Sequence, residues 1–155
     1  MAALRLFNGI APAPVGEHAF SAFLAQAGAA VAAGPPPWRV RMGPLGAVRD
    51  LIAAEDVARA VEAVIDRGVW GEPINVCSGV GRPMRALIEA TAATLPGAMV
   101  IEEAARDGGV AWSVGDPSRC EARLGFRPSA DLSAITDAAA GWIMAQRRAD
   151  ARTGA

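Results

Sequence analysis

The chain has 155 residues, with 15 basic residues against 16 acidic ones and a formal net charge of −1. Every basic residue is arginine, and the sequence holds neither lysine nor tyrosine. These absences exclude a tyrosine proton donor, a lysine Schiff base and a phosphate-loop lysine within this chain. The near-zero net charge offers no basic field for nucleic acid and no polybasic membrane anchor, so we expect neither as a partner.

Cysteine usage and the N-terminal region point to an intracellular protein. Cys77 and Cys120 are far apart in sequence and form no C-x-x-C motif, which is typical of reduced thiols. Residues 19–34 are small and apolar, but the region ahead of them contains proline and charge, unlike a signal peptide. The same stretch is too short to span a bilayer. We therefore expect a soluble, cytoplasmic protein.

Short apolar runs alternate along the chain with stretches of helical periodicity. This alternation predicts an α/β fold in one compact portion, residues 1–146, followed by a polar tail, residues 147–155. The strands are expected at about residues 3–8, 38–42, 47–52, 73–77 and 98–101. The helices are expected to bury apolar side chains within residues 20–31, 57–65, 83–95 and 131–143, with a short one between Asp116 and Gly125.

One segment imitates a dinucleotide-binding fingerprint. Residues 79–84, with the sequence G-V-G-R-P-M, follow a predicted strand and precede a predicted helix, and an acidic pair comes about 20 residues later. Met84 stands where a small residue should let helix and strand approach, and Pro83 removes an amide from the helix start. A tight strand-to-helix turn is the favoured interpretation, with cofactor binding as the alternative.

Several arginines adjoin polar residues in predicted loops: Arg49, Arg82, Arg85 and Arg106. Their planar donors suit phosphate oxygens, but a solvated or ion-paired surface role is the favoured interpretation for each one taken alone. His18 has no serine or cysteine partner at a recognisable spacing, and no carboxylate pair stands out. We therefore assign no catalytic residue and no metal ligand from the residues alone.

Four segments occur in a characteristic order: 5–12 (R-L-F-N-G-I-A-P), 43–60 (with A-V-R-D-L-I and E-D-V-A-R-A), 71–79 (G-E-P-I-N-V-C-S-G) and 115–128 (with G-D-P-S-R and L-G-F-R-P). Together they resemble motifs of the extended short-chain dehydrogenases/reductases, the NAD-dependent epimerase/dehydratase family. The phrases F-N-x-I, A-V-R-D and N-V-C-S-G are most similar to those of GDP-4-keto-6-deoxymannose reductases.

The resemblance implies the C-terminal, substrate-binding half of a Rossmann-type fold. The last Rossmann strands would lie at about residues 3–8 and 73–77, and the N-terminal dinucleotide-binding strands would be missing. The glycine-rich cofactor loop and the Tyr-x-x-x-Lys pair of the family belong to that missing half. NAD(P) is therefore implied only together with a complementary half, and no cofactor is expected on this chain alone.

The same resemblance assigns substrate-binding residues. Asn8 matches the asparagine that touches the substrate, Arg49 the arginine that grips the diphosphate, and Arg106 a second such arginine. Ser21 and Gln26 match polar residues on the sugar side. The chain departs from the family pattern at three places, which weakens the case for an intact site: Ala11 for glycine, Gly109 for aspartate, and apolar Leu24–Ala25 for a charged residue.

The expected function is the nucleotide-sugar-binding half of a nucleoside-diphosphate-sugar reductase or epimerase, with a GDP-sugar as the favoured ligand. Such a half would not be catalytically competent by itself. The alternative is a binding module or gene remnant without turnover. A sheet without most of its strands should leave open edges and an apolar face, so we expect a Rossmann-half partner or a homo-oligomer.

Overall fold

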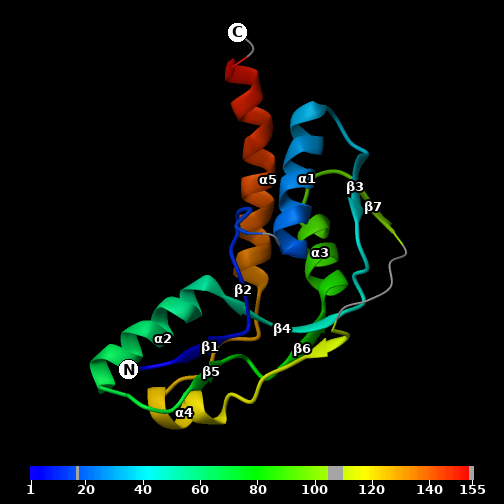
Figure 1. The fold of residues 1–155 in the computed structure, drawn as a ribbon. Helices are drawn as coiled ribbons and strands as arrows, with labels where there is room; N and C mark the ends of the chain where they lie inside the picture. The colour runs from blue at the N-terminus through cyan, green and yellow to red at the C-terminus, as the bar shows by residue number, and fades with distance from the viewer. Residues whose placement is uncertain (17, 105–109, 154–155) are drawn as a thin grey trace. The chain divides into compact units, whose positions relative to one another are not determined.

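The computed structural model describes residues 1–16, 18–104 and 110–153, and it confirms the predicted α/β class (Figure 1). All of the strand pairs whose register is defined among these residues are parallel. The strands are β1 (Leu4–Leu6), β2 (Asn8–Ile10), β3 (Trp38–Met42), β4 (Val48–Ala53), β5 (Ile74–Val76), β6 (Gly81–Pro83), β7 (Met99–Glu103) and β8 (Trp112–Ser113). The helices are α1 (Ala19–Ala33), α2 (Ala54–Arg67), α3 (Met84–Ala93), α4 (Ser118–Leu124) and α5 (Ser133–Thr153).

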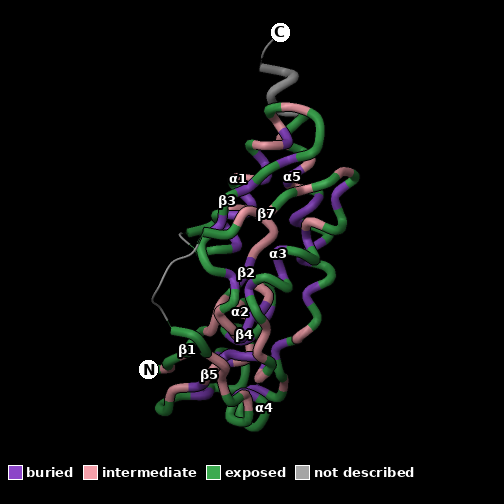
Figure 2. The backbone as a smooth tube through the Cα atoms, turned by 90° about the vertical axis from the view of Figure 1, so that its right-hand side faces the viewer, coloured by how far each residue is buried: buried purple, intermediate pink, exposed green. Residues whose placement is uncertain are grey.

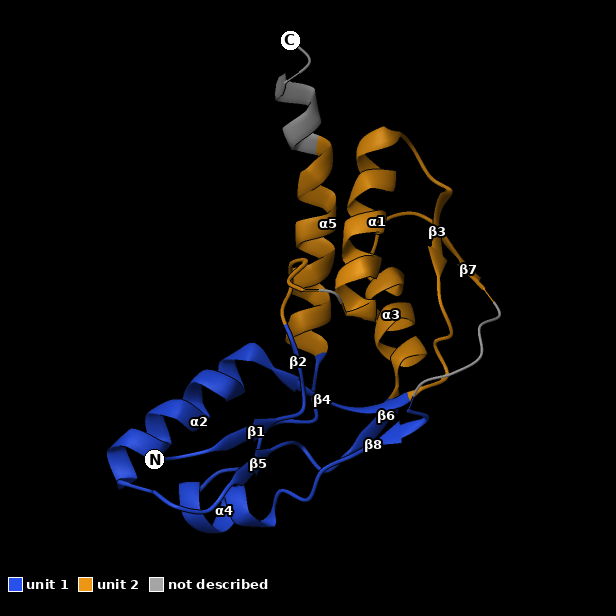
Figure 3. Ribbon diagram, in the orientation of Figure 1, with its two compact units in different colours: residues 1–10, 48–82, 110–132 blue, residues 11–47, 83–109, 133–155 orange. Residues whose placement is uncertain are grey.

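The chain forms two compact units, each assembled from three separate segments (Figure 3). The first unit comprises residues 1–10, 48–82 and 110–132, and the second comprises residues 11–47, 83–109 and 133–155. The first strand predicted from the sequence is divided at Phe7, because β1 pairs with β5 whereas β2 pairs with β4.

The first unit contains two small sheets covered by α2 and α4. The β1–β5 pair forms one sheet, and β4 is the centre of the other, between β2 and β6 with β8 also paired to it. α2 is amphipathic, and its buried residues Ala60 and Val64 join a core with Ile52, Val76 and Leu124. Left-handed glycines end both helices, Gly68 after α2 and Gly125 after α4.

The second unit is built on α1, which packs against α5, α3 and β3. Its fully buried side chains include Phe23 and Leu24 of α1, Ile88 of α3 and Ile143 of α5. The α1–α5 contact depends on a small residue, because a β-carbon at Gly28 would lie 3.0 Å from the Trp142 ring. The apolar stripe that predicts α1 from the sequence is therefore the face that forms this core.

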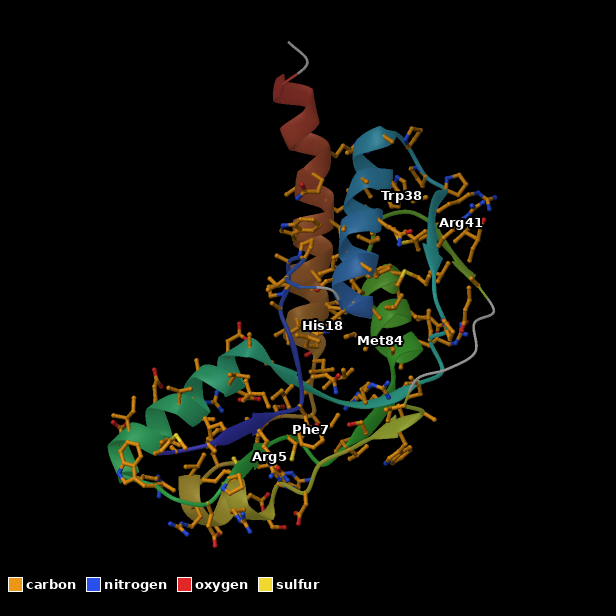
Figure 4. All side chains as sticks on the ribbon, viewed as in Figure 1. Arg5, Phe7, His18, Trp38, Arg41 and Met84 are labelled. Carbon is orange, nitrogen blue, oxygen red and sulfur yellow. The ribbon has the colours of Figure 1, made fainter. Side chains whose placement is uncertain are left out.

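Strands β3 and β7 run in parallel along all five residues of each. Buried and exposed residues alternate along β3, as the two-residue period of a strand requires (Figure 2), and Trp38 and Arg41 fall on its opposite faces. Arg39 and Arg41 both donate to the carboxylate of Glu102, at 2.9 and 3.1 Å. Figure 4 shows Arg41 extending from β3.

Three details differ from the sequence-based expectations. The predicted turn between β5 and α3 contains a further strand, β6, and the pair formed by β4 and β8 was not expected. A three-residue strand with glycine and proline has no apolar alternation that could reveal it. The last helix begins at Ser133 rather than directly after Asp131, and it continues through Thr153, into the segment expected as a tail. Among the helices described, none is both long and apolar enough to cross a bilayer.

The ion pairs of Glu102 make the stability of the second unit dependent on pH. Hydrogen bonds from Arg41 and Arg39 hold the pKa of the Glu102 carboxyl below its ordinary value. A carboxyl group whose pKa is lower in the folded state stabilises that state at pH values above the pKa of the unfolded chain, about 4.3. This contribution is lost as the pH falls through the pKa of the folded state. Glu102→Gln should therefore lower the thermal midpoint at pH 7, and the difference from wild type should shrink as the pH falls below about 4.3. Glu62→Gln, on the exposed face of α2, is the control, and a difference that persists unchanged at pH 3 would contradict the assignment.

Candidate functional site

A buried carboxylate organises the first unit. Asp50 lies in β4 and is completely inaccessible to solvent. One carboxylate oxygen accepts hydrogen bonds from the backbone N–H of Ser78, at 2.8 Å, and from the Ser78 hydroxyl, at 2.7 Å. The other accepts the N–H groups of Gly79, at 2.9 Å, and Gly115, at 3.2 Å. Four donors thus satisfy a group that would otherwise be costly to bury.

This network joins three parts of the chain that are distant in sequence: strand β4, the turn after β5 and the loop before α4. Gly79 has φ +75°, a left-handed conformation, and a β-carbon there would meet Arg127 and Pro117. A β-carbon at Gly115 would collide with Cys77 and Phe7. The glycines therefore allow the two loops to approach the Asp50 carboxylate, which fixes their backbone.

Two of the residues expected to bind substrate, Asn8 of β2 and Arg49 of β4, lie beside Asp50. Asn8 opens β2 opposite Leu51 of β4, and its side-chain amide donates to the Asp50 carbonyl at 3.1 Å. Arg49 immediately precedes Asp50 and pairs with Ser113 of β8. Because side chains alternate across a strand, Arg49 and Asp50 point to opposite faces of β4. The buried carboxylate thus holds the strand whose other face presents the arginine.

Arg49 is a half-buried cation without an acidic partner in the described part of the chain. Its guanidinium donates to the Val48 carbonyl at 2.8 Å, and none of the described carboxylates lies within ion-pair distance of it. By contrast, Arg59 is paired with Asp56, and Arg85 with both Glu89 and Glu103. The remaining guanidinium donors of Arg49 suit a phosphate or another anion.

The other expected substrate-binding residues belong to the second unit or lie outside the described residues. Ser21 belongs to the second unit, where its hydroxyl donates to the Val15 carbonyl at 2.7 Å and accepts the Val15 N–H at 3.2 Å. Gln26, in the same unit, uses both ends of its amide on the backbone of Arg41, each at 2.9 Å. Arg106 and Gly109 lie outside the described residues. Ser21 and Gln26 therefore order local backbone.

The segment that imitates a dinucleotide fingerprint has a local structural role. The N–H of Gly79 is held by Asp50, and a β-carbon at Gly81 would meet the side chains of Val48 and Val114. Strand β6 occupies residues 81–83, and α3 begins only at Met84, where Pro83 is the N-cap residue. A pyrophosphate needs free amides at a helix N-terminus directly after the glycines, and this segment does not offer them.

Neither cysteine is suited to nucleophilic chemistry. Burial, together with the nearby Asp50 carboxylate, raises the pKa of the Cys77 thiol to about 11. Burial also raises the pKa of Cys120. Both thiols therefore remain protonated near neutral pH, and the thiolate is the reactive form. Among the described residues, no group of three histidine, cysteine or acidic side chains is arranged to hold a metal ion.

Sequence reasoning missed two residues of this site. The sequence motifs include Asp50 only as part of A-V-R-D, although a charged residue inside a buried strand is a signal for a hydrogen-bonded anchor. Arg127, in the loop after α4, donates from Nε to the Ser78 carbonyl at 2.7 Å and contacts Glu121 at 3.4 Å. Arg127 therefore binds the carbonyl of the same Ser78–Gly79 turn whose N–H groups are bound by Asp50.

Similar folds occur among solved structures, although no protein-family model and no curated protein matches the sequence. RMD from Pseudomonas aeruginosa, solved with NADPH, is 23% identical with a TM-score of 0.78, over 94% of this chain and 48% of that one. UDP-glucose-4-epimerase from Stenotrophomonas maltophila, solved with NAD and formylated UDP-arabinopyranose, is 25% identical with a TM-score of 0.73. The match covers 96% of this chain and 48% of the epimerase. UDP-N-acetylglucosamine 4-epimerase from Methanobrevibacter ruminantium M1, in complex with UDP-N-acetylmuramic acid, is 23% identical with a TM-score of 0.70. The match covers 94% of this chain and 46% of that epimerase.

These neighbours are enzymes of the NAD-dependent epimerase/dehydratase class, and the chain spans about half the length of each. The likeness confirms the expected fold, part of a Rossmann-type short-chain dehydrogenase/reductase fold. Within that fold, the described residues combine a hydrogen-bonded buried carboxylate with a half-buried arginine on the same strand. This combination places an arginine that has no described acidic partner on a strand held by a buried carboxylate.

Asp50 should be the most sensitive polar position of the first unit. Asp50→Ala would leave the N–H groups of Ser78, Gly79 and Gly115 without their acceptor, so the free energy of unfolding should fall by about 3 kcal/mol. Asp50→Asn, which retains one acceptor oxygen, should cost less. Asp66→Asn, on the exposed face of α2, is the matched control. Urea unfolding measures all three, and equal effects at positions 50 and 66 would refute the anchoring role.

Proposed function

We propose that this chain is the nucleotide-sugar-binding half of an NAD(P)-dependent nucleoside-diphosphate-sugar reductase or epimerase. The observation that carries the proposal is Arg49, a half-buried guanidinium without an acidic partner in the described part of the chain, on a strand held by Asp50. A diphosphate supplies the paired anionic oxygens that such a group binds with charge-assisted hydrogen bonds. Asn8, whose amide nitrogen is used by the Asp50 carbonyl, offers its side-chain oxygen to a ligand hydroxyl.

Sequence motifs and fold likeness support the same assignment. The solved neighbours include complexes with UDP-sugars, and the matched length is about half of each enzyme. The motif resemblance to GDP-4-keto-6-deoxymannose reductases favours a GDP-sugar as the ligand. Arg106 would be a second diphosphate contact, and Ser21 would contribute only if its bonds to Val15 were exchanged for ligand contacts.

The proposed half does not catalyse turnover by itself. The sequence has no tyrosine and no lysine, so the proton donor and its lysine partner would come from a complementary half that also binds NAD(P). Such a half could belong to a partner chain acting in the cytoplasm, and a homo-oligomer is the other arrangement that would cover the open sheet. The dinucleotide is therefore assigned to the complementary half and the nucleotide sugar to this chain.

Titration calorimetry with GDP-mannose and UDP-glucose tests the proposal. We expect wild type to bind, with the GDP-sugar bound more tightly. Arg49→Ala should weaken binding roughly thirtyfold, the equivalent of losing about 2 kcal/mol of charge-assisted hydrogen bonding. Arg49→Lys should recover only part of the loss, because an ammonium group cannot form the paired contacts of a guanidinium.

Arg123→Ala is the control, because Arg123 is exposed on α4 in the same unit. Equal losses at positions 49 and 123 would assign the binding to general charge and refute the site. No binding of either nucleotide sugar would favour the second candidate function, a gene remnant without ligand or turnover. The specific observation behind that candidate is the use of Ser21 and Gln26 on backbone rather than toward a ligand.

A further inference from the structure

Arg49 and Arg82 differ from the other arginines of the chain in burial. Both are half-buried, whereas every other arginine whose side chain is described is exposed. Like Arg49, Arg82 has no carboxylate of the described residues within ion-pair distance. A charge that is partly withdrawn from water is usually paired with an opposite charge. Within the described part of the chain, these two residues therefore combine partial burial with the absence of an ionic partner.

The two arginines lie on the same face of one sheet. β4 and β6 are hydrogen-bonded neighbours in that sheet, within the first unit (Figure 3). A β-carbon at Gly81 would lie 2.8 Å from Cγ1 of Val48, so position 81 of β6 and Val48 of β4 face the same side. Since side chains alternate along each strand, the next residues, Arg82 in β6 and Arg49 in β4, both point to the opposite side.

Arg49 and Arg82 also lie at the same level along the two strands. Each is one residue away from the contact between position 81 and Val48. Neighbouring strands of a sheet are about 4.8 Å apart. Two arginines that project from the same face at this level can therefore reach neighbouring groups of one small ligand.

Each guanidinium is ordered by a single backbone carbonyl. Nη2 of Arg82 donates to the Ala130 carbonyl at 2.6 Å, and Arg49 uses the Val48 carbonyl in the same way. The loop that carries Ala130 is fixed in turn, because the N–H of Ser129 donates to the Asp56 carboxylate at 2.8 Å. A guanidinium has five N–H donors. Both arginines are thus positioned before a ligand arrives, and both keep donors for it.

Two cations on one face of a sheet repel each other, and partial burial weakens the screening of this repulsion by water. An anion bound to both removes the repulsion and supplies the missing ionic partner. A diphosphate has two linked phosphate groups, and the oxygens of each accept the paired hydrogen bonds of a guanidinium. The chemistry of the arginine pair therefore favours a diphosphate over a single phosphate.

We propose that Arg82 is a phosphate-binding residue that acts together with Arg49, so that the two guanidinium groups bind the two phosphates of one diphosphate. The identity of the ligand rests on the proposed function, in which this diphosphate belongs to a nucleotide sugar. The motif resemblance assigns no binding role to Arg82, and the residue adds to the contacts proposed for Arg49 and Arg106. Binding by both arginines would make the site select a diphosphate against a monophosphate.

Inorganic pyrophosphate tests the proposal without any nucleoside or sugar. The isotopically labelled full chain is titrated with pyrophosphate, and the arginine side-chain Nε–Hε resonances are followed by NMR. The resonances of Arg49 and Arg82 should shift with the same midpoint, because a single ion contacts both residues. Orthophosphate, which has only one phosphate group, should require a roughly tenfold higher concentration to reach half of its shift.

Variants of the full chain connect these shifts to affinity. Arg82→Ala should weaken pyrophosphate binding roughly tenfold and bring it close to the affinity for orthophosphate. Arg82→Lys should recover only part of the loss, because an ammonium group keeps the charge but not the paired donors. Arg5→Ala is the matched control, since Arg5 also lies in the first unit without a described acidic partner but is exposed on β1.

Several results would overturn the proposal: no shift of Arg82 while Arg49 responds, different midpoints for the two arginines, or equal losses of affinity at positions 82 and 5. Equal midpoints for pyrophosphate and orthophosphate would assign the arginines to single phosphates and overturn it too. The wild-type titration does not depend on how well the variants fold. Pyrophosphate bound by both arginines, without binding of either nucleotide sugar, would refute the proposed function but support the arginine pair. Nucleotide-sugar binding without a response of Arg82 would refute the pair alone.

Discussion

The hydrogen bonds to the Asp50 carboxylate are the interaction on which the candidate site depends. They connect residues that are 28, 29 and 65 positions apart in the sequence, so they fix three segments that no local preference would bring together. A buried ion is retained only when its donors are complete, and here two glycines allow the backbone to come close enough to complete them. The arginine on the other face of β4 is consequently held on a rigid strand rather than on a mobile loop.

This arrangement separates the tasks of neighbouring charged residues. Asp50 supplies order and has no access to solvent, whereas Arg49 keeps guanidinium donors free of any described carboxylate. The glycine-rich segment that could be mistaken for a cofactor loop provides one of the donors for Asp50, the N–H of Gly79. Sequence motifs that look like a cofactor site and a substrate site thus contribute to a single structural network in the first unit. The second unit is stabilised independently, by the α1–α5 contact and by ion pairs between β3 and β7.

The sequence predicted those parts of the fold that local patterns encode. Apolar periodicity located α1, α2 and α3, and apolar runs located β3, β4 and β5. It did not reveal β6 or β8, whose few residues become strands only because β4 offers them a hydrogen-bonding edge. It identified Arg49 and Asn8 through motifs but not the anchoring role of Asp50, because that role depends on partners contributed by distant loops. Ser21 was a plausible ligand by motif, and only three-dimensional structure shows its hydroxyl bound to Val15.

The central claim is that a strand anchored by Asp50 presents Arg49 to the diphosphate of a nucleotide. The most direct measurement is an NMR titration of the isotopically labelled full chain with GDP, following the arginine side-chain Nε–Hε resonances and the Asn8 side-chain amide. The account predicts saturable shifts for Arg49 and Asn8 that are lost in Asp50→Ala, while the resonance of Arg123 stays in place. Shifts spread evenly over the exposed arginines, or an Arg49 response that is unchanged in Asp50→Ala, would contradict it.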